Sequence, residues 1–103
     1  MYKLTTYIPT DYLEPVKQAL FAAGAGQIGN YQHCCWQILG RGQFMPLAGN
    51  HAFIGTTNEL EQVEEWRVEM VVEADKIAKV VQALKQSHPY ETPAYDVIML
   101  ADF

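Results

Sequence analysis

The sequence predicts an α+β fold in which a four-stranded antiparallel sheet carries two helices on one face. Two observations lead to this fold class. Four segments have the residue pattern of strands and two have that of helices, and their order along the chain is strand, helix, strand, strand, helix, strand. The length of 103 residues, half of them hydrophobic, suits one compact domain with a modest core. We therefore expect residues 1–103 to form a single domain.

The first strand and the first helix have the clearest local signals. The segment Tyr2 to Pro9 alternates between two faces, as a half-buried strand does. Thr10 and Asp11 offer side-chain oxygens for the N-cap of the helix, and Glu14 follows Asp11 at capping-box spacing. Apolar residues then recur at helical spacing, namely Leu13, Val16, Leu20 and Ala23. Gly24 and Gly26 end the helix, because glycine readily adopts the left-handed conformation found past helix ends.

The segment from Gly24 to Gly55 is interrupted by glycine at positions 24, 26, 29, 40, 42, 49 and 55. We predict a strand from Cys34 to Leu39, a turn or bulge at Gly40 to Gly42, a short continuation at Gln43 to Pro46 and a loop up to Thr57.

The second half of the chain returns to clear patterns. Glu64 to Glu73 alternates, with Trp66, Val68, Met70 and Val72 on one face and Glu65, Arg67, Glu69 and Val71 on the other. Asp75 to Ser87 has the spacing of an amphipathic helix with an acidic first turn, and Pro89 ends it. Ala94 to Leu100 reads as the last strand. Together the elements predict a ferredoxin-like split βαβ fold, whose second sheet face needs a partner or solvent.

Composition excludes two classes of partner. The net charge is −5 with a pI near 5.0, and the seven Lys and Arg residues are scattered, so no basic stripe is available for nucleic acid. No window approaches the ~18 apolar residues of a membrane span, and Met1 to Pro9 lacks the pattern of a signal peptide. We expect a cytoplasmic protein.

The adjacent Cys34 and Cys35 are poorly placed for a structural disulfide.

Several motifs, taken in order, resemble one known family. They are Ile8-Pro9, Ala23 to Tyr31, Cys34, Trp36, Gly40 to Gly42 with Phe44, Ile54-Gly55, the Glu65, Arg67, Glu69 strand, His88-Pro89-Tyr90-Glu91 and Ala94-Tyr95-Asp96. Across nearly the whole chain, the sequence is similar to the inserted PII/CutA-like domain of the NIF-three-like family. The resemblance implies a PII/CutA-like version of the ferredoxin-like fold and a homotrimer that forms through the sheets.

The resemblance also limits what can be transferred. Full-length members carry this domain between two halves that together hold a dinuclear metal site, and this sequence contains neither half. We therefore expect a stand-alone homologue, to which names such as metal-dependent hydrolase or cyclohydrolase do not apply. Cys35 stands where the family usually has serine, and Thr92 and Pro93 replace an acidic and an apolar residue.

The run His88 to Glu91 is the leading candidate site, because it gathers an imidazole, a phenol and a carboxylate at one junction. We expect intersubunit clefts that bind a divalent metal or a small polar ligand. Imidazole and carboxylate are suitable ligands for zinc or copper, and His33 beside the two cysteines resembles a soft-metal cluster. The predicted metal ligands are His33, Cys34 and His88. The predicted ligand-binding residues are Tyr31, Glu69, Tyr90 and Glu91.

Other interpretations of the same residues stay open. His88 suits the negative end of the helix dipole without any ligand, and lone His and Cys residues are more often structural. One rival function is therefore a structural or protein-interaction domain. The other is a hydrolase-type enzyme with His88 as general base and Glu91 or Cys34 as its partner, although no nucleophile motif supports it. The glycines of Gly24 to Gly29 follow a helix rather than a strand, which is wrong for a dinucleotide-binding turn.

Overall fold

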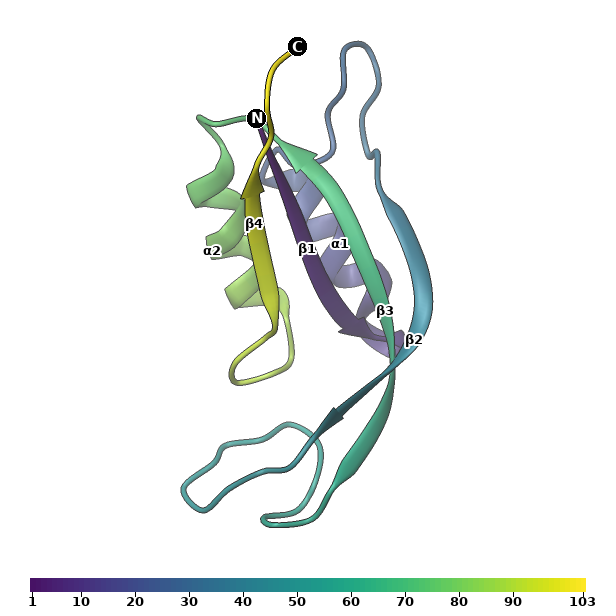
Figure 1. Ribbon diagram of the computed structural model, residues 1–103, viewed down its shortest axis with the longest axis vertical. Coiled ribbons are helices and arrows are strands. Elements are labelled where there is room, and N and C mark those ends of the chain that lie inside the picture. Colours follow the sequence, from purple (N-terminus) through teal and green to yellow (C-terminus); the bar gives the residue numbers. More distant parts are fainter.

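The computed structural model describes residues 1–103 and confirms the predicted fold class. Its four strands form one antiparallel sheet in the order β2-β3-β1-β4, and both helices lie on the same face of that sheet (Figure 1). The elements are β1 (Tyr2–Pro9), the short 3-10 helix η1 (Thr10–Tyr12), α1 (Leu13–Ala22), β2 (Trp36–Phe44), β3 (Glu61–Val72), α2 (Ile77–Ser87) and β4 (Tyr95–Met99). Neither helix has the length and hydrophobicity needed to span a membrane.

The hydrophobic core lies between the sheet and the two helices. Strand alternation directs Leu4 and Ile8 of β1, together with Val68 of β3, toward the helices. Helical spacing directs the apolar faces of α1 and α2 back onto them. The helix residues with no exposed surface are Val16, Leu20, Val80 and Leu84. The predicted alternation of strands β1 and β3 is therefore confirmed.

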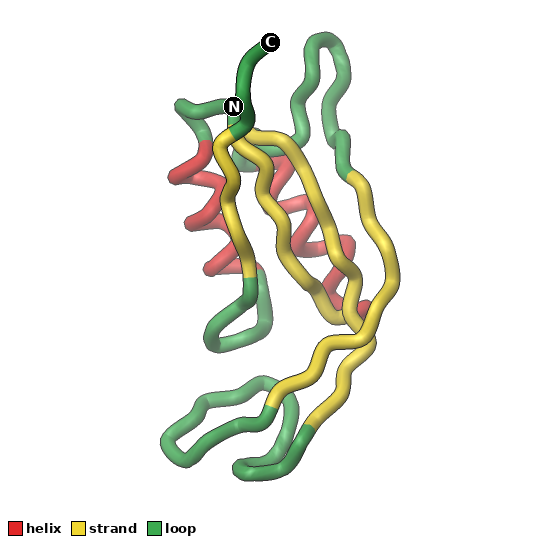
Figure 2. The backbone as a smooth tube through the Cα atoms, in the orientation of Figure 1, coloured by secondary structure: helices red, strands yellow, loops and turns green.

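The predicted turn at Gly40 to Gly42 is wrong. Strand β2 runs without interruption from Trp36 to Phe44, with Gly40 opposite Glu65 and Gly42 opposite Val63 on β3. Glycine is unfavourable in a strand, but here β3 is long enough to supply a pairing partner at every position. The two strands form a ribbon that extends past β1 and β4 and curves beneath them (Figure 2).

Two details of the predicted helix starts are also wrong. Asp11 lies in the 3-10 helix, the N-cap of α1 is Tyr12 with no side-chain cap, and Glu14 pairs instead with Lys17 at 3.1 Å. Helix α2 begins at Ile77, so Asp75 precedes the helix and its first turn carries no acidic residue. Capping patterns mark a region rather than a residue, because packing against the sheet sets where each helix begins.

The second face of the sheet carries no helix. Trp36 and Ile38 of β2 and Ile98 of β4 lie on this open face and are 55%, 50% and 50% exposed. Between them, β3 presents Arg67 and Glu69. The open face is thus a mixture of charged side chains and half-exposed apolar ones.

Candidate functional site

The β2–β3 ribbon curves beneath the α2–β4 loop (Figure 1). Residues of the ribbon, of the β2–β3 loop and of the α2–β4 loop line the main cleft of the molecule, which has a volume of about 760 Å³. Its apolar lining includes Ile38, Phe44, Leu47, Phe53 and Ile54. Its polar lining includes Arg41, Glu65, Arg67, Tyr90 and Glu91. Apolar walls with a few converging polar groups are the usual composition of a small-molecule site.

His88 anchors the α2–β4 loop beside this cleft. It is 5% exposed, and its two ring nitrogens make different hydrogen bonds. The backbone N–H of Tyr90 donates to Nδ1 at 3.1 Å. Nε2 therefore carries the proton and donates to the carbonyl oxygen of Tyr7 at 2.7 Å. Burial lowers the pKa of His88 and outweighs the Tyr7 hydrogen bond and the Glu65 charge, which act in the opposite direction. His88 is thus a neutral side chain with both nitrogens occupied.

Tyr90 connects the same loop to β3. Its hydroxyl donates to Oε2 of Glu65 at 2.7 Å, and its ring lies 6.1 Å from that of Phe44. Burial raises the pKa of the Tyr90 phenol, and the hydrogen bond to Glu65 and the charge of that carboxylate raise it further. Tyr90 therefore stays protonated and acts as a hydrogen-bond donor rather than as a base.

Glu91 closes the cleft on the other side. Its Oε2 accepts a hydrogen bond at 3.1 Å from the backbone N–H of His51, which lies in the loop between β2 and β3. The α2–β4 loop is thereby joined to β1 through His88, to β3 through Tyr90 and to the β2–β3 loop through Glu91.

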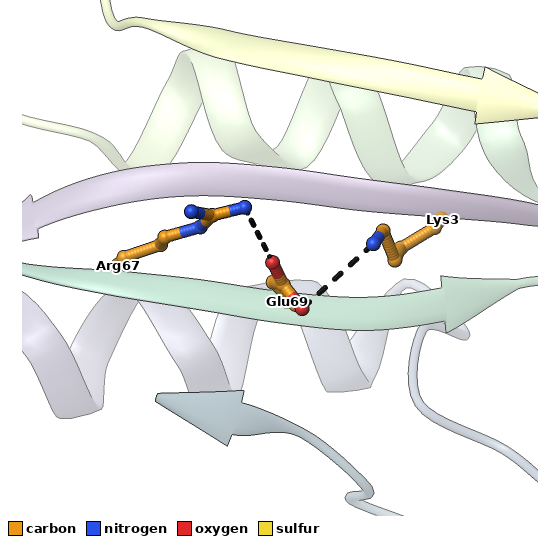
Figure 3. Close-up of polar contacts among 3 residues, drawn as sticks. All are labelled: Lys3, Arg67 and Glu69. Atoms are coloured by element: carbon orange, nitrogen blue, oxygen red, sulfur yellow. Dashed lines mark ion pairs between the residues drawn. The ribbon is translucent and has the colours of Figure 1, made fainter. Parts of the chain in front are cut away.

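A chain of ion pairs runs along the open face from the cleft (Figure 3). Arg67, which lines the cleft, contacts Glu69 at 2.7 Å between Nη2 and Oε1. The other Glu69 oxygen lies 3.9 Å from Nζ of Lys3. The side chain of Arg67 is still 48% exposed, so its remaining N–H groups face the cleft and solvent.

Only part of the predicted site comes together in one chain. Tyr90 and Glu91 line the cleft, and His88 lies directly behind Tyr90, with the two rings 4.8 Å apart. Glu69 is in the ion-pair chain outside the cleft lining. Tyr31 is 73% exposed and pairs with Ile28 in a separate hairpin.

The predicted metal ligands lie at two ends of the sheet. The ring of His33 stacks on that of Phe21, with the ring centres 4.7 Å apart. The backbone N–H of Cys34 donates to the carbonyl oxygen of Gly26, and the N–H of Gly26 donates to the carbonyl oxygen of Val71 on β3. Val71 lies opposite Lys3, near the start of β1. His88 instead contacts Tyr7 near the end of β1. No three His, Cys, Asp or Glu side chains of the chain gather in a metal-binding arrangement. The metal prediction therefore stays a prediction that needs donors from more than one subunit.

Sequence reasoning missed most of the lining of the cleft. The local pattern around Phe44, Phe53 and Arg41 does not assign them to a site, because the curvature of the β2–β3 ribbon brings them together. A usable signal was present at Gly40 and Gly42, since alternate glycines in a strand often mark the close approach of another group.

Comparison with known proteins matches the chain to one segment of larger proteins. It is 45% identical over 102 residues to the GTP cyclohydrolase 1 type 2 homolog of Halalkalibacterium halodurans, a match that covers 99% of this chain and 27% of that protein. The chain thus spans about a quarter of the length of the curated relatives it matches. No family model matches it.

Solved structures agree with both parts of the predicted resemblance. A Bacillus cereus protein related to NIF3 superposes with a TM-score of 0.83 at 40% identity, covering 98% of this chain and 26% of that one. The periplasmic divalent cation tolerance protein CutA of Archaeoglobus fulgidus superposes with a TM-score of 0.69 at 17% identity, covering 100% and 87%. The first match shows similarity to a segment of a NIF3-related protein, and the second shows the CutA-like fold.

Proposed function

We propose that this chain is a small binding module that takes a small polar ligand in the cleft between the β2–β3 ribbon and the α2–β4 loop, and that it works as a homotrimer. One observation carries the proposal. Apolar walls that include Phe44 and Phe53 and polar groups that include Arg67 and Tyr90 face one space of about 760 Å³. That space is large enough for a ligand of drug or nucleotide size.

The lining favours a ligand with a flat apolar body and a polar or anionic group. Aromatic walls contact flat rings well, and the free N–H groups of Arg67 suit an anionic oxygen. The name of the relatives, GTP cyclohydrolase 1 type 2 homolog, refers to GTP, which combines a planar base with phosphates. GTP is therefore the first organic probe to test, although the proposal concerns binding and not turnover.

A divalent metal is the second ligand class. The proposed donors, His33, Cys34 and His88, do not meet within one chain, so a zinc or copper site requires donors from neighbouring subunits. A metal on His88 would also have to replace one of its two backbone hydrogen bonds. For these reasons the small organic ligand is the leading candidate.

The open face of the sheet supports assembly into a trimer. Trp36, Ile38 and Ile98 are at least half exposed on this face, and burial of such a patch between subunits is favourable. The resemblance to PII/CutA-like domains suggests a trimer as the assembly. We also propose a cytoplasmic location, with which two free cysteines are compatible.

Adjacent residues of β2 provide a matched test of the trimer. Ile38 lies on the open face and Leu39 on the opposite one, and they are 50% and 46% exposed. Ile38→Glu should convert the trimer to monomers in sedimentation velocity, because it places a charge in the interface, whereas Leu39→Glu should leave it intact. Monomeric wild-type protein would refute the trimer.

Native mass spectrometry tests the ligand. The purified protein is measured before and after chelation, and then with added zinc, copper, manganese or GTP. We expect one GTP per subunit, lost in Arg67→Ala and kept in Lys79→Ala, which removes an equal charge from an exposed position on α2. Uptake of metal alone, lost in His88→Ala, would favour the metal-binding alternative.

The two rival functions make different predictions for the same protein. A structural or interaction domain would bind none of these probes, and His88→Ala would change stability alone. A hydrolase-type enzyme using His88 and Glu91 would turn GTP over. Both nitrogens of His88 are occupied and no hydrogen bond joins it to Glu91, which favours binding over hydrolysis.

A further inference from the structure

Gly42 leaves room for a carboxylate on the open face of β2. A Cβ atom at this position would collide with the carboxylate of Glu65, which reaches across from β3. At Gly40, two residues earlier on the same face, a Cβ would meet only the backbone oxygen of Glu65, at 3.9 Å. Of the two glycines, only Gly42 therefore provides the space that the Glu65 carboxylate fills.

The seated carboxylate is the acceptor that holds Tyr90. The Tyr90 hydroxyl donates to it at 2.7 Å, and this is the bond that ties the α2–β4 loop to the β2–β3 ribbon. His88 fixes the start of that loop on β1, and Glu91 meets the backbone of His51 beyond it. Without the Glu65 bond, the loop would keep its anchor on β1 but lose its direct bond to β3.

We infer that Glu65 is a positioning residue: seated over Gly42, it holds Tyr90 and so fixes the α2–β4 loop as a wall of the cleft. This inference rests on the proposed function, because it gives the wall a role in ligand binding. A bond from a neutral donor to a carboxylate is among the stronger hydrogen bonds in proteins, so this contact adds substantially to the ties made by His88 and Glu91.

Paired substitutions in the full chain test the inference. In Gly42→Ala the new methyl group displaces the Glu65 carboxylate, whereas Gly40→Ala leaves it in place. NMR of protein labelled with ¹³C on the tyrosine rings follows the titration of Tyr90. Because burial and, after it, the Glu65 contact raise the pKa of this phenol, we expect the Tyr90 ring to begin to ionise at a lower pH in Gly42→Ala than in Gly40→Ala or wild type.

Hydrogen exchange gives a second readout without any ligand. The amide of His51 is bonded to Glu91, so it reports whether the wall is in place. We expect its exchange to be roughly tenfold faster in Gly42→Ala, the effect of losing one hydrogen bond to a charged group, and unchanged in Gly40→Ala. Tyr90→Phe should reproduce the faster exchange, which keeps the test valid if Gly42→Ala does not fold.

GTP titration separates this inference from the proposed function. Both glycines line the cleft, so a methyl group at either position can touch the ligand. GTP binding that is roughly tenfold weaker in Gly42→Ala than in Gly40→Ala supports both. If wild-type protein binds no probe while Tyr90 and His51 respond as expected, the positioning role holds and the proposed function fails. The positioning role is wrong if the Tyr90 ring ionises over the same pH range in the two glycine variants. It is also wrong if the His51 amide exchanges at the same rate in wild type and in Tyr90→Phe. Either result holds whether or not GTP binds.

Discussion

The two faces of the sheet differ in how their side chains are stabilised. On the helix-covered face, Leu4, Val68 and Leu84 have no exposed surface and contribute through burial of apolar area. On the open face, Arg67 and Glu69 form ion pairs beside half-exposed apolar residues. One face therefore supplies most of the stability of the domain, and the other is available for binding and assembly.

The largest effect should come from the core of the covered face. Leu84→Ala removes a fully buried side chain of α2 and should lower the free energy of unfolding by about 2–5 kcal/mol. Ile98→Ala, a truncation on the open face at a residue that is 50% exposed, should cost well under half as much in the monomer. Urea denaturation of both variants in a monomeric background measures the difference. Equal losses would contradict the division between the faces.

His88, behind the cleft, should give the next largest effect. His88→Ala removes the partner of the Tyr7 carbonyl and leaves the Tyr90 N–H without its acceptor, which should destabilise the protein by about 1–3 kcal/mol for each buried group left unpaired. Thermal unfolding at pH 7.5 measures the loss, with exposed His51→Ala as the control. A loss no larger than that of the control would show that the two hydrogen bonds contribute little.

The same histidine should make stability depend on pH. Because burial lowers the pKa of folded His88 below its ordinary value of 6.5, the unfolded chain binds the proton first as the pH falls. Stability is thus complete above about pH 6.5 and is lost as the pH falls through the lowered pKa of the folded state. Urea unfolding between pH 7.5 and 5 should show this slope reduced in His88→Gln but kept in His51→Gln. An unchanged slope in His88→Gln would assign it to other groups.

The ion pairs of the open face should have the smallest effect on the monomer. The side chains of Lys3, Glu69 and Arg67 are 35%, 22% and 48% exposed, so solvent screens their attraction. Glu69→Gln should lower the free energy of unfolding by less than about 1 kcal/mol in protein diluted until it is monomeric, and less still in high salt. A markedly larger loss in the trimer than in this monomer would indicate that assembly buries the network.

Local patterns predicted the parts of the fold that local physics controls. Alternation placed β1 and β3 and divided the residues of each between two faces, because a strand buried on one side must have a period of two. Patterns failed where several elements act together. Gly40 to Gly42 looked like a turn, and only the long β3 strand showed why the chain continues straight through both glycines.

The residues of the candidate site also fall into those that the sequence indicates and those that only the structure reveals. His88, Tyr90 and Glu91 were identified from the sequence because they crowd one helix–strand junction, and two of them do line the cleft. Arg41 and Phe53 could not be found, since they reach the cleft through the curvature of the ribbon.

The sequence by itself determined the order of the elements, the alternation of β1 and β3 and the junction around His88. These features depend on residue periodicity and on backbone preferences that act over a few residues. The tertiary structure alone decided that both nitrogens of His88 are used internally, that Glu65 rests over Gly42 to hold Tyr90, and that His33 and Cys34 lie far along the sheet from His88. The physical reason is that hydrogen-bond partners and free space are properties of neighbours distant in sequence, which only the paired and curved sheet brings into contact.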